Sequence, residues 1–234
     1  MAHTTGSLRA VQIADGSALL GADLRVPADP TGLIIFAHGS GSSRRSVRNR
    51  QVAEMLDDAG LATLLLDLLT PQEESIDQFT REFRFDIPRL GRRVIAGADW
   101  AAEQADLRRL PLGFFGASTG AAAAIIAAAE RPQRAAAVVS RGGRPDLAGG
   151  ALARLEAPTL LIVGGADEPV IELNEQAQRQ MRAVTRLEIV SGATHLFEEP
   201  GTLDEVARLA IAWFRQHLAT QGGPHVQESS GLRR

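Results

Sequence analysis

Short, continuous apolar runs alternate with helix-like patterns along most of this chain, and this alternation restricts the fold more than any other feature. Runs without intervening polar residues indicate strands that are buried on both faces. Such strands with helices between them predict a mostly parallel sheet covered by helices on both faces. We expect strands at residues 33–37, 62–67, 112–116, 136–140, 159–164 and 186–190, and helices at 46–59, 88–105, 118–130, 147–155, 171–182 and 203–218.

The chain opens with a predicted hairpin, whose strands cover residues 11–13 and 18–26 and are separated by Asp15-Gly16. The hairpin brings the predicted sheet to about eight strands. The mixed, polar segment 70–86 is expected to be a loop with a short helical piece. In open sheets of this kind ligands bind beyond the carboxyl ends of the strands, so the chemistry should lie in the residues that follow each strand.

Length and composition narrow the class of protein. The chain has 234 residues, and we expect one domain over residues 1–221 and a disordered polar tail over residues 222–234. The sequence contains no Cys, Tyr or Lys, which excludes disulfides, a cysteine nucleophile and lysine Schiff-base chemistry. A net charge of −3 does not favour nucleic acid as a partner. Without a signal peptide or an apolar stretch of about 20 residues, we expect a cytoplasmic protein with no membrane partner.

The strongest local motif is Gly116-Ala117-Ser118-Thr119-Gly120, which follows an apolar run and opens an Ala-rich helix. This is G-x-S-x-G in the strand, turn and helix context that exposes a nucleophilic serine. Glycines leave room for the sharp turn, and the start of the helix faces the developing negative charge. The motif predicts Ser118 as a nucleophile, although a tight structural turn would use glycines too.

A serine nucleophile needs a base and a group that orients the base. His195 and Asp167 each follow a predicted strand, and the chain order Ser118, Asp167, His195 is that of an α/β-hydrolase triad. Both residues also have non-catalytic interpretations: Asp167 could be the N-cap of the next helix, and His195 could be a loop histidine without a catalytic role. Asp146, after the preceding strand, is the alternative acid.

The oxyanion hole requires backbone N–H groups close to the serine. Thr119, directly after the nucleophile, should supply one of them. The segment His38-Gly39-Ser40-Gly41 is rich in small residues, and we expect Ser40 to supply the second, with Gly39 as the alternative. His38 is interpreted as a residue that organises this loop rather than as a base.

These motifs together resemble the α/β-hydrolase superfamily, and within it the small dienelactone-hydrolase-like enzymes. The resemblance covers almost the whole chain and implies an α/β-hydrolase fold, an acyl-enzyme mechanism and no metal or other cofactor. Dienelactone hydrolases of the resembled branch use a cysteine nucleophile, whereas this chain has Ser118. We therefore expect a serine esterase (carboxylesterase type) acting on a small-molecule ester.

Gly39, together with several polar and aromatic residues, is a candidate for substrate contacts. Arg44 and Arg141 follow strands, where an arginine can bind a carboxylate, although solvated loop arginines are the plainer interpretation. Phe79 lies in the segment that could partly cover the site, although packing onto the core is the plainer alternative. Between the predicted strands 136–140 and 159–164 there is too little chain for a large cap.

The sequence is also compatible with other functions. The same triad suits a lactone, thioester or peptide bond, and the fold also occurs as a binding module without activity. The apolar closing helix could also pair with the same helix of a second copy in a homodimer.

Overall fold

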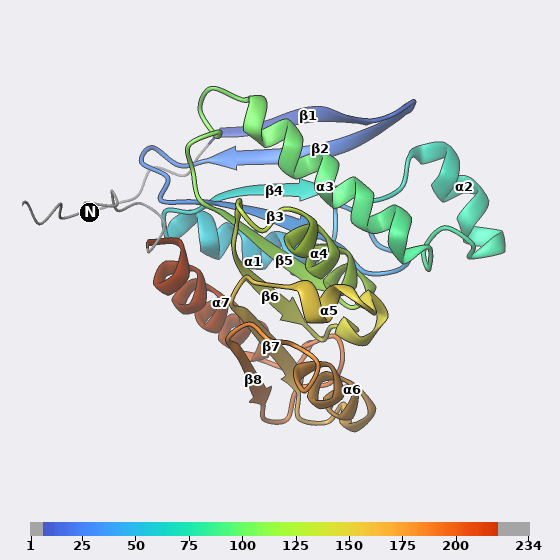
Figure 1. The fold of residues 1–234 in the computed structure, drawn as a ribbon, viewed down its shortest axis with the longest axis vertical. Helices are drawn as coiled ribbons and strands as arrows, with labels where there is room; N and C mark the ends of the chain where they lie inside the picture. Colours follow the sequence, from blue (N-terminus) through green and yellow to red (C-terminus); the bar gives the residue numbers. More distant parts are fainter. Residues whose placement is uncertain (1–6, 220–234) are drawn as a thin grey trace, which may run out of the picture.

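The computed structural model describes residues 7–219 of the chain. Its central feature is a sheet of eight strands in the order β1-β2-β4-β3-β5-β6-β7-β8, which confirms the predicted fold class (Figure 1). β3 to β8 run parallel, and β1 and β2 form an antiparallel hairpin at one edge. The strands are Ser7–Asp15, Ala18–Val26, Leu33–Ala37, Ala62–Leu66, Leu112–Ala117, Ala135–Arg141, Thr159–Gly164 and Thr185–Val190.

Helices cover both faces of the sheet. α1 (Val47–Asp58) and α7 (Thr202–Leu218) pack on one face against Phe36 and Phe115. The opposite face carries α3 (Ile87–Glu103) and α4 (Thr119–Glu130), together with α5 (Ala151–Arg154) and α6 (Glu168–Gln178). β3, β4, β5, β6 and β7 are buried along their whole length, as their uninterrupted apolar runs predict.

The segment predicted as a loop with a short helical piece contains a full helix, α2 (Pro71–Thr80). Thr70 and Glu73 form a capping box, in which each side chain bonds the other residue's backbone N–H. Pro71 in the first turn and Arg81 in a left-handed conformation mark the two ends. α2 projects beyond the carboxyl end of β4, where a partial cover was expected (Figure 1).

Several other boundaries differ from the prediction: β1 begins at Ser7 rather than at residue 11, and α6 ends at Gln178 rather than at residue 182. The single helix predicted over residues 147–155 is divided into a 3-10 turn (Pro145–Ala148) and α5, because Gly149 adopts a φ of +53°. α6 begins at Glu168, three residues earlier than predicted, because Pro169 suits its first turn. The chain between β6 and β7 forms no large cap, as expected. The predicted disordered tail lies outside the described residues.

Within residues 7–219, none of the helices combines the length and the apolar character needed to cross a membrane.

Candidate active site

Ser118 sits at a strained turn between β5 and α4. Its φ of 50° and ψ of −123° are unusual for a residue other than glycine. The glycines on either side permit this turn, because a Cβ on Gly116 would overlap the backbone of Ala121 and one on Gly120 would overlap the carbonyl of Ala37. Strain of this kind, at the point where a strand meets a helix, is the geometry of a nucleophile elbow.

His195 and Asp167 are joined by a hydrogen bond. The distance from His195 Nδ1 to Asp167 Oδ2 is 2.7 Å. Asp167 lies in the turn after β7 and His195 in the loop after β8, two neighbouring parallel strands that bring them to the same edge of the sheet. The bond occupies Nδ1 and leaves Nε2 of the imidazole to exchange a proton with another group.

The segment after β6 connects Ser118 to the histidine loop. The Ser118 N–H donates to the carbonyl of Arg141 at 3.2 Å. A Cβ placed on the next residue, Gly142, would lie 3.0 Å from the carbonyl oxygen and 3.7 Å from Cε1 of His195. Gly142 has a φ of +50° and therefore lets the histidine loop approach the nucleophile turn.

Ser40 and Thr119, the two residues expected at the oxyanion hole, lie next to each other. Their hydroxyl oxygens are 2.9 Å apart, within hydrogen-bond distance. A Cβ on Gly39 would lie 3.0 Å from Cβ of Ser118, so the loop after β3 passes directly beside the nucleophile. The structure thus brings both expected donor segments to Ser118.

His38 organises this loop through both ring nitrogens. Nδ1 is 2.9 Å from the carbonyl oxygen of Gly39, and Nε2 accepts the N–H of Leu68 at 2.9 Å. A ring that donates at one nitrogen and accepts at the other is neutral. Burial lowers the pKa of His38, which favours the same state. Its position matches the structural role expected from the sequence.

Arg44, one of the two arginines considered for substrate contact, is occupied by carboxylates. Its guanidinium forms ion pairs with Asp67 and, at 3.2 Å, with Asp23, and its backbone N–H donates to Asp67 at 2.7 Å. Burial would lower the pKa of Arg44, but the two carboxylates raise it overall. Arg44 therefore ties the loop after β3 to β2 and to the end of β4.

Arg141 lies beneath the site and is only 6% exposed. Its Nη2 donates to Oδ1 of Asn49 at 3.2 Å, and its guanidinium lies 5.9 Å from the ring centroid of Phe197. Burial, and then the nearby charge of Arg48, lower the pKa of Arg141 to about 10. Within residues 7–219 no carboxylate forms an ion pair with it.

The remaining candidates lie apart from this cluster. Asp146, the alternative acid, forms a bidentate pair with Arg144 at 2.7 and 2.8 Å, whereas His195 bonds to Asp167. Phe79 on α2 is 82% exposed and thus does not pack onto the core. No group of three or more His, Cys, Asp or Glu side chains in the described part of the chain is arranged to hold a metal ion.

A cleft of about 410 Å³ lies beside the expected oxyanion loop. Serines 42, 43 and 46 line it, together with Arg45, Asp67 and Glu74. Glu74 lies on α2, where a glutamate on a polar helix carries no signal that would distinguish it in the sequence. Burial and the neighbouring Asp77 and Asp67 raise its pKa.

Three comparisons place the chain among known proteins. The family model described as the dienelactone hydrolase family matches residues 20–218. A crystal structure of a dienelactone hydrolase from Anabaena variabilis ATCC 29413 is 55% identical, with a TM-score of 0.89 over 91% of this chain and 99% of that one.

More distant structures share the fold alone. Est1E from Butyrivibrio proteoclasticus is 18% identical, with a TM-score of 0.74 over 90% of this chain and 99% of its own. Carboxyl esterase 2 from Tuber melanosporum is 16% identical, with a TM-score of 0.70 over 92% of this chain and 88% of its own.

Two curated proteins of Mycobacterium tuberculosis, from strains CDC 1551 / Oshkosh and ATCC 25618 / H37Rv, are each named "Putative phosphoribosyl transferase". Each is 55% identical over 212 residues, or 91% of this chain. The chain spans 47% of the length of these relatives.

Proposed function

The chain belongs to the dienelactone hydrolase family, and we propose that it is a serine hydrolase that cleaves small carboxylic esters through Ser118. The observation that carries the proposal is the His195–Asp167 hydrogen bond at 2.7 Å, in a loop that reaches the strained turn of Ser118. A histidine held in this way by a carboxylate is the usual base for a serine nucleophile.

In the proposed reaction, Nε2 of His195 accepts the hydroxyl proton as Ser118 attacks the ester carbonyl. The carbonyl oxygen becomes an oxyanion, and the backbone N–H groups of Thr119 and Ser40 stabilise it. Collapse of this intermediate breaks the bond to the alcohol, which leaves with the proton from His195. Water then attacks the acyl-enzyme with the same assistance, releasing the carboxylic acid and restoring Ser118.

Asp167 has an orienting role in this scheme. Its bond to Nδ1 fixes the tautomer in which Nε2 is the proton acceptor, and its charge stabilises the imidazolium that forms. The amino end of α4 also points at the reacting centre, where the helix dipole favours the negative charge.

A lactone is the second candidate substrate, because the 55% identical relative from Anabaena is named a dienelactone hydrolase. A lactone is an internal ester, so the same attack opens the ring and leaves alcohol and acid on one product. Comparing kcat/KM for lactones with that for short p-nitrophenyl esters and thioesters decides between these substrates.

Phosphoribosyl transfer is not proposed for this site. That name belongs to proteins of which this chain spans 47%, and the hydrogen bond between His195 and Asp167 supports the proposal of acyl transfer instead.

The test uses Ser118→Ala and the matched control Ser75→Ala, which alters a serine on α2. We expect Ser118→Ala to lose hydrolysis of p-nitrophenyl acetate and covalent labelling by a fluorophosphonate, with its melting temperature preserved. Ser75→Ala should retain both. Full labelling of the Ser118→Ala variant would show that the nucleophile lies elsewhere, and the absence of labelling in the wild type would favour a binding module.

A further inference from the structure

One edge of the sheet ends at β8 (Thr185–Val190), and no described strand lies beyond it. β8 bonds to β7 through its even-numbered residues: the carbonyl of Val184 accepts from Thr159 at 2.8 Å and that of Val190 from Gly165 at 2.8 Å. Backbone groups alternate in direction along a strand. The N–H and carbonyl groups of Leu187 and Ile189 therefore point away from β7, toward the open edge.

The open edge is largely available for pairing. Gln178 Nε2 donates to the carbonyl of Thr185 at 3.2 Å, and this carbonyl retains a second lone pair. The structure records no hydrogen bond to the outward groups of Leu187 and Ile189 from any residue within 7–219. An edge that presents such groups in a row is a template for another strand.

The sequence of β8 complements itself when two copies run antiparallel around a two-fold axis at Leu187. In this register Leu187 faces Leu187 of the second copy, and the two residues exchange both of their backbone hydrogen bonds. Thr185 then faces Ile189 of the other copy, and both of these residues direct their backbone groups outward. The outward groups of β8 therefore match a hydrogen-bonded antiparallel ladder without a change of register.

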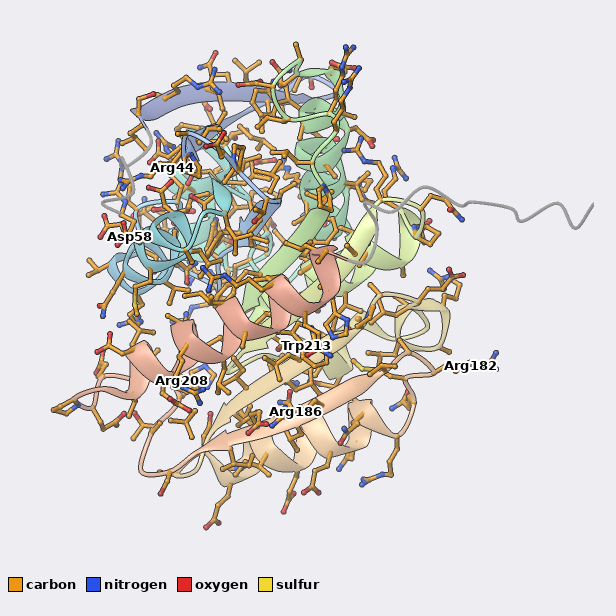
Figure 2. All side chains as sticks on the ribbon, turned by 90° about the vertical axis from the view of Figure 1, so that its left-hand side faces the viewer. Arg44, Asp58, Arg182, Arg186, Arg208 and Trp213 are labelled. Carbon is orange, nitrogen blue, oxygen red and sulfur yellow. The ribbon has the colours of Figure 1, made fainter. Side chains whose placement is uncertain are left out.

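The charges of β8 also match in this register. Arg186 and Glu188 project from the same face of β8 and form an ion pair with each other. Their side chains are 64% and 25% exposed. In the two-fold arrangement Arg186 of each copy lies directly opposite Glu188 of the other, at positions where opposite charges stabilise a sheet. Figure 2 shows Arg186 on β8, beside α7 with Arg208.

Apolar side chains flank the same edge. Val184 is 67% exposed and Ile189 is 45% exposed, and both belong to the small set of large apolar residues that are solvent-exposed in the described chain. A second copy would cover both side chains. We propose that the protein forms a two-fold symmetric homodimer in which β8 of one copy pairs antiparallel with β8 of the other, so that the sheets become continuous.

Charge reversal tests this register directly. Arg186→Glu places like charges opposite each other at two positions of the dimer, and so does Glu188→Arg. The double variant Arg186→Glu/Glu188→Arg restores opposite charges in both positions. Each single variant also removes the ion pair between residues 186 and 188 within one copy. The melting temperature is therefore measured to establish that the fold is preserved.

Sedimentation velocity over a concentration series gives the dimer dissociation constant. We expect a dimeric wild type, roughly tenfold weaker association in each single variant, and recovery to within about threefold of the wild type in the double variant. A wild type that is monomeric throughout overturns the proposal. Single variants that associate as tightly as the wild type, or a double variant that does not recover, would place any dimer on another surface or in another register.

Discussion

Glu73 anchors α2 beside the proposed active site, and replacing it with Gln should destabilise the protein in a pH-dependent way. Both carboxylate oxygens accept hydrogen bonds from Arg93, each at 2.6 Å, and one also accepts from Arg89 at 3.1 Å. The carboxylate further accepts the backbone N–H of Thr70 at 2.8 Å. The side chain of Arg93 is only 4% exposed and that of Glu73 19%, so water screens this pair weakly.

The size of the effect follows from the pKa of Glu73. Burial tends to raise this pKa, but the hydrogen bonds from Arg93 and from the Thr70 backbone lower it from 4.5 to about 2. A carboxyl group whose pKa falls by this amount on folding contributes about 3 kcal/mol to the free energy of unfolding at neutral pH. Gln keeps the size of the side chain but removes the charge, leaving the buried Arg93 with Asp15, 3.6 Å away, as its remaining carboxylate partner among the described residues. We therefore expect a loss of about 3 kcal/mol at pH 7.

The stabilisation by Glu73 must weaken as the pH falls, because the pKa of Glu73 is lower in the folded state than in the unfolded state. The contribution is complete above the unfolded value of 4.5 and disappears as pH falls through the folded value of about 2. Urea unfolding of the wild type and the Glu73→Gln variant should therefore show a difference that is roughly halved at pH 3.

Glu74→Gln provides the matched control on the same helix. Burial and the nearby Asp77 and Asp67 raise the pKa of Glu74, so its charge is unfavourable in the fold. Gln at this position should leave the stability at pH 7 unchanged or slightly higher. Equal losses in the two variants, or a loss in Glu73→Gln that does not vary between pH 7 and pH 3, would refute the reasoning.

Two further predictions concern the chemistry. Asp167→Asn preserves the size of the side chain but removes the acceptor that fixes the His195 tautomer, so kcat for a p-nitrophenyl ester should fall by roughly 10⁴-fold; a loss below tenfold would argue against the triad. Ser40→Ala keeps the backbone N–H and removes the hydroxyl with its 2.9 Å bond to Thr119 and its 3.4 Å bond to the carbonyl of Arg84, so kcat should fall less than about tenfold. A loss of 10²-fold or more in Ser40→Ala would make the hydroxyl itself an oxyanion donor.

The order of strands and helices follows from the sequence, because each element carries its own local pattern. The buried strands Leu33–Ala37 and Thr159–Gly164 occur at the predicted residues, since uninterrupted apolar runs need no partner to be recognised. The turn at Ser118 is also encoded locally, by the two glycines that permit it. The order of Ser118, Asp167 and His195 places all three after strands, at one edge of a parallel sheet.

Partnerships between distant side chains were decided by the tertiary structure. From the sequence, Arg44 was either a solvated loop arginine or a substrate contact, but folding brings it to Asp23 and Asp67. α2 was predicted only as a short helical piece; its capping box is local, but the ion pair of Glu73 with Arg93 that ties it to α3 exists only in the tertiary structure. Such pairs join residues that lie 20 or more positions apart. Local periodicity determines which backbone conformation a segment adopts, but only packing of the elements determines which charges meet and which strand edge remains open.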